Sequence, residues 1–308
     1  MTDLDLLVLG DANPDLVLTG DVVPAFGQIE KLVDGAHLVI GGSGAITACA
    51  AARLGLRTAF VGVVGDDLFG RFMLDALRQR GVETSGSVVD PERATGLSVI
   101  LSSGNDRAIL TSEGAIADLR GELVDPDLLA SARHVHVSSY YLQCRLQPAL
   151  PSLFDLAHRA GASTSLDPNW DPFGRWDGVM DLLGRIDCFF PNSNELRAMT
   201  GIDEVDVAAK ALTEHGGVVA VKFGQGGGLA MCGDEVARSQ AIPAEVVDTT
   251  GAGDSFDAGF IAGRLAGWSL QRCLALGVAC GTLSTRAIGG TQAQPTMEEA
   301  LAVLDGLR

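Results

Sequence analysis

The sequence is short of basic residues. It has 22 lysines and arginines against 39 aspartates and glutamates, which gives its 308 residues a formal net charge of −17 at pH 7. A nucleic-acid duplex or an anionic membrane needs a basic face to bind, so we expect neither as a partner. The shortage does not exclude a small phosphate compound, because local backbone amides bind phosphate even in an acidic protein.

Paired cysteines and long apolar runs are missing as well. None of the six cysteines forms a C-x-x-C motif, and Cys49, Cys188 and Cys280 lie in apolar runs typical of buried thiols. No segment is long and uncharged enough to span a bilayer. The N-terminus carries Asp3 and Asp5 and does not resemble a signal peptide. We therefore expect a reduced, cytoplasmic protein.

Two common catalytic frameworks are absent too. Ser165 and Ser255 lack the G-x-S-x-G frame of a nucleophile elbow. No G-x-G-x-x-G follows the first apolar run, which argues against a Rossmann dehydrogenase. The histidines show no metal-ligand spacing, and His134 and His136 lie in a run that is typical of a buried strand.

The sequence does contain enough apolar residues for a large core, with 47% hydrophobic and 20% charged residues. From about residue 120, strand-like runs alternate with helical ones, which predicts an α/β fold with a mostly parallel sheet covered on both faces. We expect one domain over 1–308. The predicted strands are 4–9, 58–64, 95–101, 107–111, 134–137, 163–167, 188–191, 218–223 and 228–232, and the predicted helices are 45–54, 69–80, 148–160, 177–184, 194–200, 206–215, 252–267, 269–286 and 296–307.

Two segments stand outside this alternation. Residues 12–40 alternate short apolar runs with Gly, Pro and charge, and 93–112 contain a hairpin signal around a turn at 103–106. Together they predict a small lid sheet. Residues 10–15 are expected to form a turn, and Asp67 is expected to cap the helix that follows it.

One stretch, Val246 to Phe256, joins a strand-like run to a helical run through Gly251, Ala252, Gly253 and Asp254. Glycine lets a ligand approach the main chain closely, and the free N–H groups and positive dipole end of a helix N-terminus attract anions. The alternative is an ordinary capped helix start. The combination favours a site that holds a polyphosphate beside a carboxylate.

This stretch resembles the D-T-x-G-A-G-D-x-F signature of the ribokinase-like (PfkB) sugar kinase family. The resemblance implies a three-layer α/β/α fold with a lid, ATP as phosphate donor and Asp254 as the base for the substrate hydroxyl. It also implies that the backbone from Gly251 through Ala252 and Gly253 forms an anion hole. Phosphoryl transfer needs such alignment and charge stabilisation more than covalent help.

Three further motifs match the substrate side of that family. Gly41 and Gly42 open an Ala-rich helical run, and Asn13-x-Asp15 matches the family's sugar-binding carboxylate, since a carboxylate can accept two vicinal hydroxyls. The family usually has Asn where this chain has Ile46. The turn chemistry of Asn-Pro-Asp is the structural alternative for Asp15.

Asp167-Pro168-Asn169-Trp170 resembles the D-P-N motif of fructokinase-like members, which implies substrate contact by Asn169. Kinases of acidic sugars tend to have Arg two places after that Asn, and Asp171 stands there. We therefore expect a neutral sugar. Trp170 is expected in the core rather than against a substrate ring.

The nucleotide side rests on resemblance as well. Asn192 to Glu195 resembles the N-x-x-E motif that organises Mg²⁺, with Glu195 acting through water. A plain helix cap at Ser193 or Asn194 is the alternative. The loop from Lys222 through Gly224 to Gly227 is implied to contact the nucleotide, together with Asn192 and with Cys280 and Leu283 of a small-residue helix. Asp248 and Thr250 match a monovalent-cation loop, which makes K⁺ a hypothesis.

The predicted function is ATP-dependent phosphorylation of a small neutral sugar. A nucleoside kinase of the same family is the first alternative, because Ile46 and Trp170 would make the pocket more apolar. A non-catalytic sugar- or nucleotide-binding regulator is the second, and the intact Asp254 argues against it. A homodimer formed through the lid is also expected from the resemblance.

Overall fold

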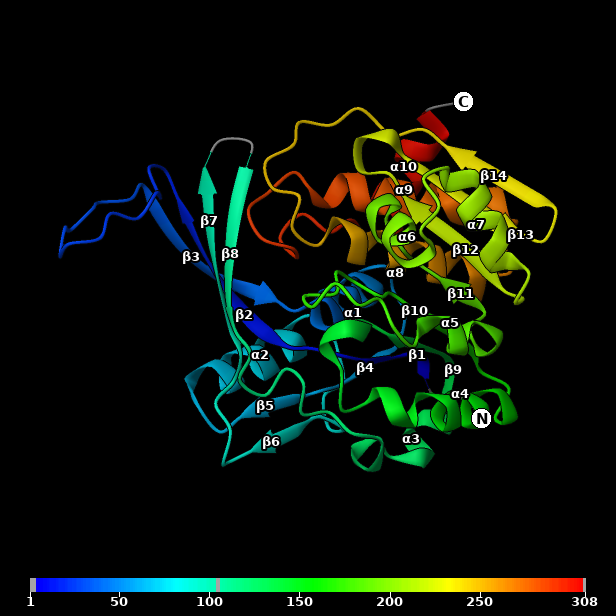
Figure 1. Cartoon of the computed structure of the whole chain (residues 1–308), viewed down its shortest axis with the longest axis horizontal. Coiled ribbons are helices and arrows are strands. Elements are labelled where there is room, and N and C mark those ends of the chain that lie inside the picture. The colour runs from blue at the N-terminus through cyan, green and yellow to red at the C-terminus, as the bar shows by residue number, and fades with distance from the viewer. Residues whose placement is uncertain (1–3, 104–105, 307–308) are drawn as a thin grey trace.

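The computed structural model describes residues 4–103 and 106–306, and its largest element is an eight-stranded sheet (Figure 1). Strands β1, β4 and β9 to β12 are parallel, while β13 and β14 add an antiparallel edge. This arrangement confirms the predicted mostly parallel sheet. Across the sheet the strands are β14 (Glu235–Ser239), β13 (Gly228–Cys232), β12 (Val218–Lys222), β11 (Cys188–Phe189), β10 (Ser163–Leu166), β9 (Ala132–Val137), β1 (Leu4–Leu9) and β4 (Thr58–Val61).

Helices cover both faces of this sheet because its strands are apolar on both sides. Along β1, Leu6 and Val8 belong to one hydrophobic core, whereas Leu7 and Leu9 belong to the other. The first core packs against α1 (Ser43–Arg53), α2 (Leu68–Gln79), α8 (Ala252–Leu265), α9 (Leu270–Ser284) and α10 (Met297–Gly306). The second packs against α3 (Pro126–Ala130), α4 (Leu150–Arg159), α5 (Val179–Leu182), α6 (Ser193–Thr200) and α7 (Val205–Thr213).

A separate four-stranded sheet, the small sheet, projects from this layered body, as Figure 1 shows at the left. Its order is β3-β2-β7-β8, so segments from both predicted lid regions pair with each other. The hairpin prediction for 95–101 and 107–111 is confirmed, although residues 104–105 of its turn lie outside the described part. The strands are β2 (Asn13–Thr19), β3 (Gly35–Gly41), β7 (Leu97–Ser103) and β8 (Asp106–Ser112).

Several local predictions were wrong, each because a distant partner decided the structure. Residues 13–15 are not a turn but the start of β2, where pairing with β3 and β7 overrides the Asn-Pro-Asp signal. The strand expected over 58–64 breaks at Gly62, and its second part, β5 (Val63–Gly65), leaves the sheet to pair with β6 (Val88–Asp90). Strands β6 and β14 and helix α3 were not predicted.

Other predictions are confirmed. Asp67 caps α2, where its Oδ1 accepts a hydrogen bond of 2.8 Å from Gly70 N. His134 and His136 are buried in β9 and both hydrogen-bond Ser165 Oγ. Burial lowers their pKa values to about 3 and about 4, so both are neutral near pH 7. Among the described residues, no helix has the length and apolarity needed to cross a bilayer.

Candidate active site

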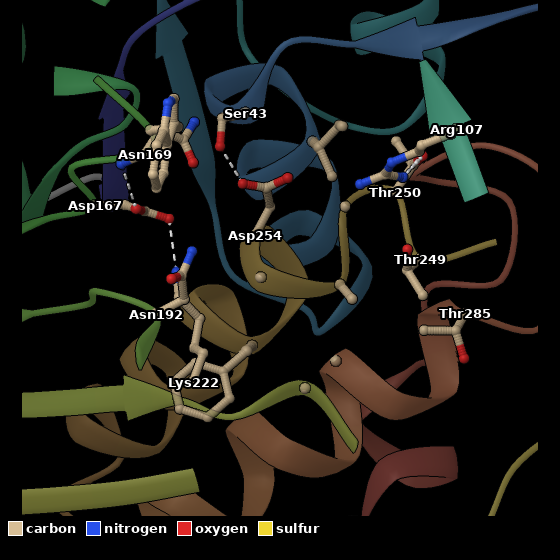
Figure 2. A pocket seen from close by; sticks show the side chains of 18 of the residues that line it. Ser43, Arg107, Asp167, Asn169, Asn192, Lys222, Thr249, Thr250, Asp254 and Thr285 are labelled. Atoms are coloured by element: carbon tan, nitrogen blue, oxygen red, sulfur yellow. Dashed lines mark hydrogen bonds and ion pairs between the residues drawn. The ribbon is translucent and has the colours of Figure 1, made fainter. Parts of the chain in front are cut away.

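The principal cavity, of about 1000 Å³, opens where the carboxyl ends of the parallel strands meet the small sheet and the N-terminus of α8 (Figure 2). Ligands of open α/β sheets bind at this edge. The lining comes from every motif that the sequence analysis singled out. It includes Asn13, Asp15, Gly42, Asn169, Asn192, Glu195, Lys222, Gly224, Gly227, Thr250, Gly251, Ala252, Gly253 and Asp254.

The turn into α8 needs glycine at its first position. Gly251 is the N-cap, with φ of 72°, and a Cβ there would lie 2.8 Å from Ile46 Cγ2 and 2.7 Å from Gly290 Cα. Ile46, which replaces the family's usual Asn, therefore packs against the turn as a buried apolar side chain. The first-turn amides of α8 have no intrahelical acceptors, and Ala252, Gly253 and Asp254 all line the cavity.

Asp254 lies in the first turn of α8 and points into the cavity (Figure 2). Its carboxylate accepts a hydrogen bond from Ser43 Oγ, at the start of α1. Burial raises the pKa of Asp254 to about 7, and the charge of Asp167 adds to the rise. A carboxylate with this pKa can take a proton near neutral pH, which is what general base catalysis requires.

Asp15 faces the same cavity as the third residue of β2 in the small sheet. Its Oδ1 accepts a hydrogen bond of 3.3 Å from Asn13 Nδ2, and Asn13 Nδ2 also reaches Ser98 Oγ at 3.2 Å. A Cβ at position 41 would overlap the Asp15 carboxylate, so Gly41 makes room for it and does not itself line the cavity. Burial, and then the charge of Asp11, raise the pKa of Asp15 to about 7.

Asp11 joins the two sides of the cavity, and the sequence analysis did not select it. Its carboxylate accepts from Ser43 N at 3.1 Å and Gly44 N at 3.0 Å, which caps α1 where the N-cap, Gly42, has no side chain. Ser139 Oγ also donates to it, at 2.9 Å. The sequence does contain a signal for Asp11, since it is an acidic residue two positions after the end of the first core strand.

Asn169 belongs to the same network. Its Nδ2 donates to Ser139 Oγ at 2.8 Å, and its N–H donates to Asp167 Oδ1 at 2.9 Å. Ser139 and Asn169 have φ values of 55° and 51°. Non-glycine residues with a left-handed backbone conformation are uncommon, and they occur most often at functional sites. The network therefore places the Asn169 amide rigidly at the cavity wall.

Asn192 and Glu195 form the start of α6. Asn192 is the N-cap, and Glu195 Oε2 accepts from Asn192 N at 2.8 Å, so the pair forms a capping box. The helix-cap alternative is therefore real, and Asn192 rather than Ser193 or Asn194 fills it. Glu195 nevertheless lines the cavity, and burial together with the charge of Asp167 raises its pKa to about 7.

Lys222 at the end of β12 is the centre of a buried charge cluster beneath the cavity. Its Nζ lies 2.8 Å from Asp167 Oδ2 and 3.2 Å from Asp257 Oδ1. Burial raises the pKa of Asp257 well above its ordinary range, and Asp257 hydrogen-bonds Asp167. Burial acts on Asp167 in the same sense, but the charge of Lys222 and hydrogen bonds outweigh it and lower the pKa of Asp167. The cluster thus joins one lysine cation to two buried carboxyl groups, of which Asp257 is the more readily protonated.

Two residues expected on the nucleotide side do not face the cavity. Cys280 and Leu283 are buried in the first hydrophobic core. The cavity face of α9 is set by the 3.6-residue period, and its members are Val278, Gly281, Thr282 and Thr285. The helix was identified correctly, but its phase was wrong.

The loop after Asn169 also differs from expectation. Trp170 is not in the core: it is 58% exposed and lines the cavity, with its ring edge-on to Trp176. Asp171 is buried and accepts hydrogen bonds from the backbone N–H groups of Phe173, Arg175 and Trp176. Asp171 therefore organises this loop. It does not face the cavity in the way expected of the Arg that kinases of acidic sugars tend to have at this position.

The loop before α8 contains Asp248 and Thr250, and the small sheet reaches it. Asp248 Oδ1 accepts from Thr250 Oγ1 at 2.7 Å, and Asp248 Oδ2 accepts from Gly289 N at 2.9 Å. Arg107 of β8 donates to Thr250 Oγ1 at 2.7 Å. Arg107 and Asp257 were not predicted as site residues, because no local motif marks them. Ser43 stands beside Gly42 in the Gly-rich motif, but no role was predicted for it.

The chain is similar to known kinases over nearly its whole length. A fructokinase of Klebsiella pneumoniae is 32% identical over 310 residues, covering 95% of this chain and 96% of its own. The structure of Arabidopsis thaliana ribokinase complexed with ribose and ATP matches 98% of each chain with a TM-score of 0.85 at 26% identity. Adenosine kinase from Sinorhizobium meliloti has a TM-score of 0.86 at 26% identity, over 98% of this chain and 99% of its own.

These similarities confirm the ribokinase-like fold predicted from the motifs. Residues 3–297 also match the pfkB family of carbohydrate kinases as a whole. The match therefore covers nearly the whole chain. The chain therefore belongs to the PfkB family of carbohydrate kinases, enzymes that transfer phosphate to an alcohol group.

Proposed function

We propose that this protein transfers the γ-phosphate of ATP to a hydroxyl of a small neutral sugar, with Asp254 as the general base. The observation that carries the proposal is the position of Asp254, which is buried in the first turn of α8 and opens into the cavity that Asp15 also lines. A base, a helix N-terminus and a hydroxyl-binding carboxylate thus share one chamber.

The proposed roles follow from the chemistry of each group. Asp15 accepts hydrogen bonds from sugar hydroxyls and Asn169 adds an amide. Asp254 takes the proton of the attacking hydroxyl, while the amides from Gly251 to Asp254 stabilise the charge on the transferring phosphoryl group. The small sheet acts as a lid that excludes water from the chamber.

The donor end of the cavity fits a nucleotide and Mg²⁺. The loop at Gly224 and Gly227 and the α9 face around Gly281 leave backbone accessible to a flat base and phosphates. Glu195 would hold Mg²⁺ through water: it is a buried carboxylate whose ionisation is opposed by Asp167 nearby. Mg²⁺ favours one or two carboxylates plus phosphates over a complete protein cage, and it would neutralise phosphate charge during transfer.

A nucleoside acceptor is the second candidate. The similarity to an adenosine kinase favours it, as does the apolar part of the cavity wall, which contains Ile100, Ile109 and the exposed Trp170. The neutral sugar remains the first choice, because Asp15, Asn13 and Asn169 place polar groups suited to several hydroxyls in one wall. A non-catalytic regulator would have no need for a buried base at Asp254.

The deciding experiment measures ADP formation with Mg·ATP over a panel of neutral sugars, acidic sugars and nucleosides, with Asp254→Asn as control. We expect a neutral sugar to stimulate ADP formation well above that of the variant. If a nucleoside is the best acceptor, the second candidate replaces the first. If no member of the panel exceeds the variant, the kinase proposal fails and a binding role must be considered.

The residues of the Asp248–Thr250 loop do not fit K⁺. Both carboxylate oxygens of Asp248 already accept hydrogen bonds, from Thr250 and from Gly289 N. The guanidinium of Arg107 also lies there, with Nη1 3.6 Å from Asp248 Oδ1. A positive charge from the chain itself therefore stands where the cation was expected, and we assign no step to K⁺.

The activity is expected to fall as the pH decreases through 7. Asp254 must be ionised to accept a proton, and its pKa is raised to about 7, so the active form is lost below that pH. Asp15 and Glu195 titrate in the same range, so kcat/KM should drop at least tenfold per pH unit well below pH 7, roughly as expected for one or more essential bases. Rates from pH 5.5 to 8.5, with folding checked by circular dichroism, test this; a flat profile would exclude Asp254 as the base.

We also propose that two copies associate through the small sheet. Its outer residues Leu38 and Leu110 are 41% and 62% exposed, and together they place apolar surface on one face of a short sheet. Light scattering should give twice the chain mass, and Leu110→Asp should shift the protein toward the monomer. A monomeric wild-type protein at micromolar concentration would contradict the proposal.

A further inference from the structure

The small sheet touches the main body at a chemically important place, through Arg107 of β8. Its Nη1 donates to Thr250 Oγ1 at 2.7 Å and lies 3.6 Å from Asp248 Oδ1 (Figure 2). Thr250 lies 143 positions after Arg107 in the sequence. The contact therefore depends on where the small sheet lies relative to the body.

The loop that Arg107 reaches is directly connected to the phosphate-binding turn. Thr250 precedes Gly251, the N-cap of α8. Asp248 Oδ1 accepts from Thr250 N at 2.8 Å and from Thr250 Oγ1 at 2.7 Å. A change in the position of Thr250 would therefore shift the amides that follow it.

The groups around this loop are mostly acidic. Asp248 is largely buried, with 15% of its side chain exposed, and its charge raises the pKa of Asp15 across the cavity. The charge of Arg107 lowers the pKa of Asp15. Asp254 adds another buried carboxyl, which lines the cavity together with Asp15. Without Arg107, the acidic groups around the anion-binding turn would repel both each other and an incoming polyphosphate.

We propose that Arg107 is a positioning residue that joins the small sheet to the phosphate-binding turn. It supplies, from the small sheet, the positive charge that a monovalent cation would otherwise bring to the Asp248–Thr250 loop. Closure of the small sheet thereby arranges the amides from Gly251 to Asp254, so that the turn is complete only over a covered cavity. This inference rests on the proposed phosphotransfer, but its structural part can be tested without turnover.

Hydrogen exchange of the ligand-free protein provides that test. Arg107→Met keeps the length of the side chain and removes the guanidinium. We expect amide exchange in β7–β8 and in 248–255 to become roughly tenfold faster, as follows from losing a hydrogen bond to a charged group. Arg71→Met is the matched control, because Arg71 pairs with Asp66 on the surface at 3.2 Å, outside the principal cavity. Exchange unchanged in Arg107→Met, or raised equally in the control, would overturn the inference.

Kinetics with an accepted substrate then separates positioning from general destabilisation. Wild-type activity should not change when K⁺ is replaced by tetramethylammonium. Arg107→Met should raise the KM for the acceptor about tenfold and become activated by K⁺, while Arg107→Lys should retain most of the activity. A wild-type enzyme that requires K⁺ would contradict the inference. If no acceptor supports ADP formation, the proposed function fails alone and hydrogen exchange still decides the role of Arg107.

Discussion

Asp254→Asn is expected to lower kcat roughly 10³-fold, within the range seen for loss of a general base. The asparagine side chain has nearly the same shape and can still accept the hydrogen bond from Ser43 Oγ, but it cannot take a proton from the substrate hydroxyl. The KM for ATP should change little, because the first-turn amides of α8 remain in place. Steady-state ADP formation with the best acceptor measures the effect. A residual activity within tenfold of the wild type would show that another group removes the proton.

The same variant should be more stable than the wild type in alkaline solution, which serves as its folding control. Burial raises the pKa of Asp254 from 3.8 to about 7, so the folded protein holds that proton more tightly than the unfolded chain. The stabilisation from the protonated carboxyl is complete below pH 4 and is lost as the pH rises through 7. Asp254→Asn avoids this loss, and we expect a gain of about 4 kcal/mol at pH 8 and almost none at pH 4. Urea unfolding at both pH values tests the sign.

Lys222→Met is expected to destabilise the protein by about 3–5 kcal/mol, because it leaves the ionised Asp167 buried without its cation. The ammonium group lies 2.8 Å from Asp167 and 3.2 Å from Asp257. The melting temperature should fall by roughly 10 °C for a chain of this size. Calorimetry of the ligand-free protein at pH 7 measures the change. A loss below 1 kcal/mol would mean that the cluster is neutralised in another way.

Two matched variants test the charge assignment of this cluster. Lys210→Met removes an exposed lysine that forms an ion pair with Asp234 at the surface. This variant should lose less than about 1 kcal/mol of stability. Asp257→Asn should also be mild, because burial raises the pKa of Asp257 well above its ordinary range and so favours its neutral, protonated form. Asp167→Asn should be far more costly than Asp257→Asn. The reverse order would show that the proton lies on Asp167.

The motifs at the ends of strands could be predicted from the sequence because their chemistry is local. The first turn of α8 needs a glycine at 251 and a carboxylate three positions later, and both stand in one continuous stretch. Likewise, Asn192 and Glu195 reveal the start of α6 by their spacing alone. Strands and helices of the α/β body followed from apolar periodicity, which reflects burial on one or two faces.

Orientation and long-range pairing could not be predicted in this way. The 3.6-residue period identified α9, but only packing against α8 decides that Thr282 faces the cavity while Cys280 and Leu283 face the core. Trp170 was assigned to the core because large apolar side chains are usually buried. The hydrogen bonds of Asp171 instead hold its loop at the rim of the cavity.

The sequence by itself determined the family, the reaction type and the residue proposed as the base. These follow from contiguous motifs, because the function of each motif depends on a local turn into a helix. Only the tertiary structure decided which distant charges meet. It placed Asp257 beside Lys222, Asp11 under the start of α1 and Arg107 against Thr250. Such contacts join segments far apart in the chain, so their partners have no shared spacing, and burial in a common low-dielectric site is what couples them.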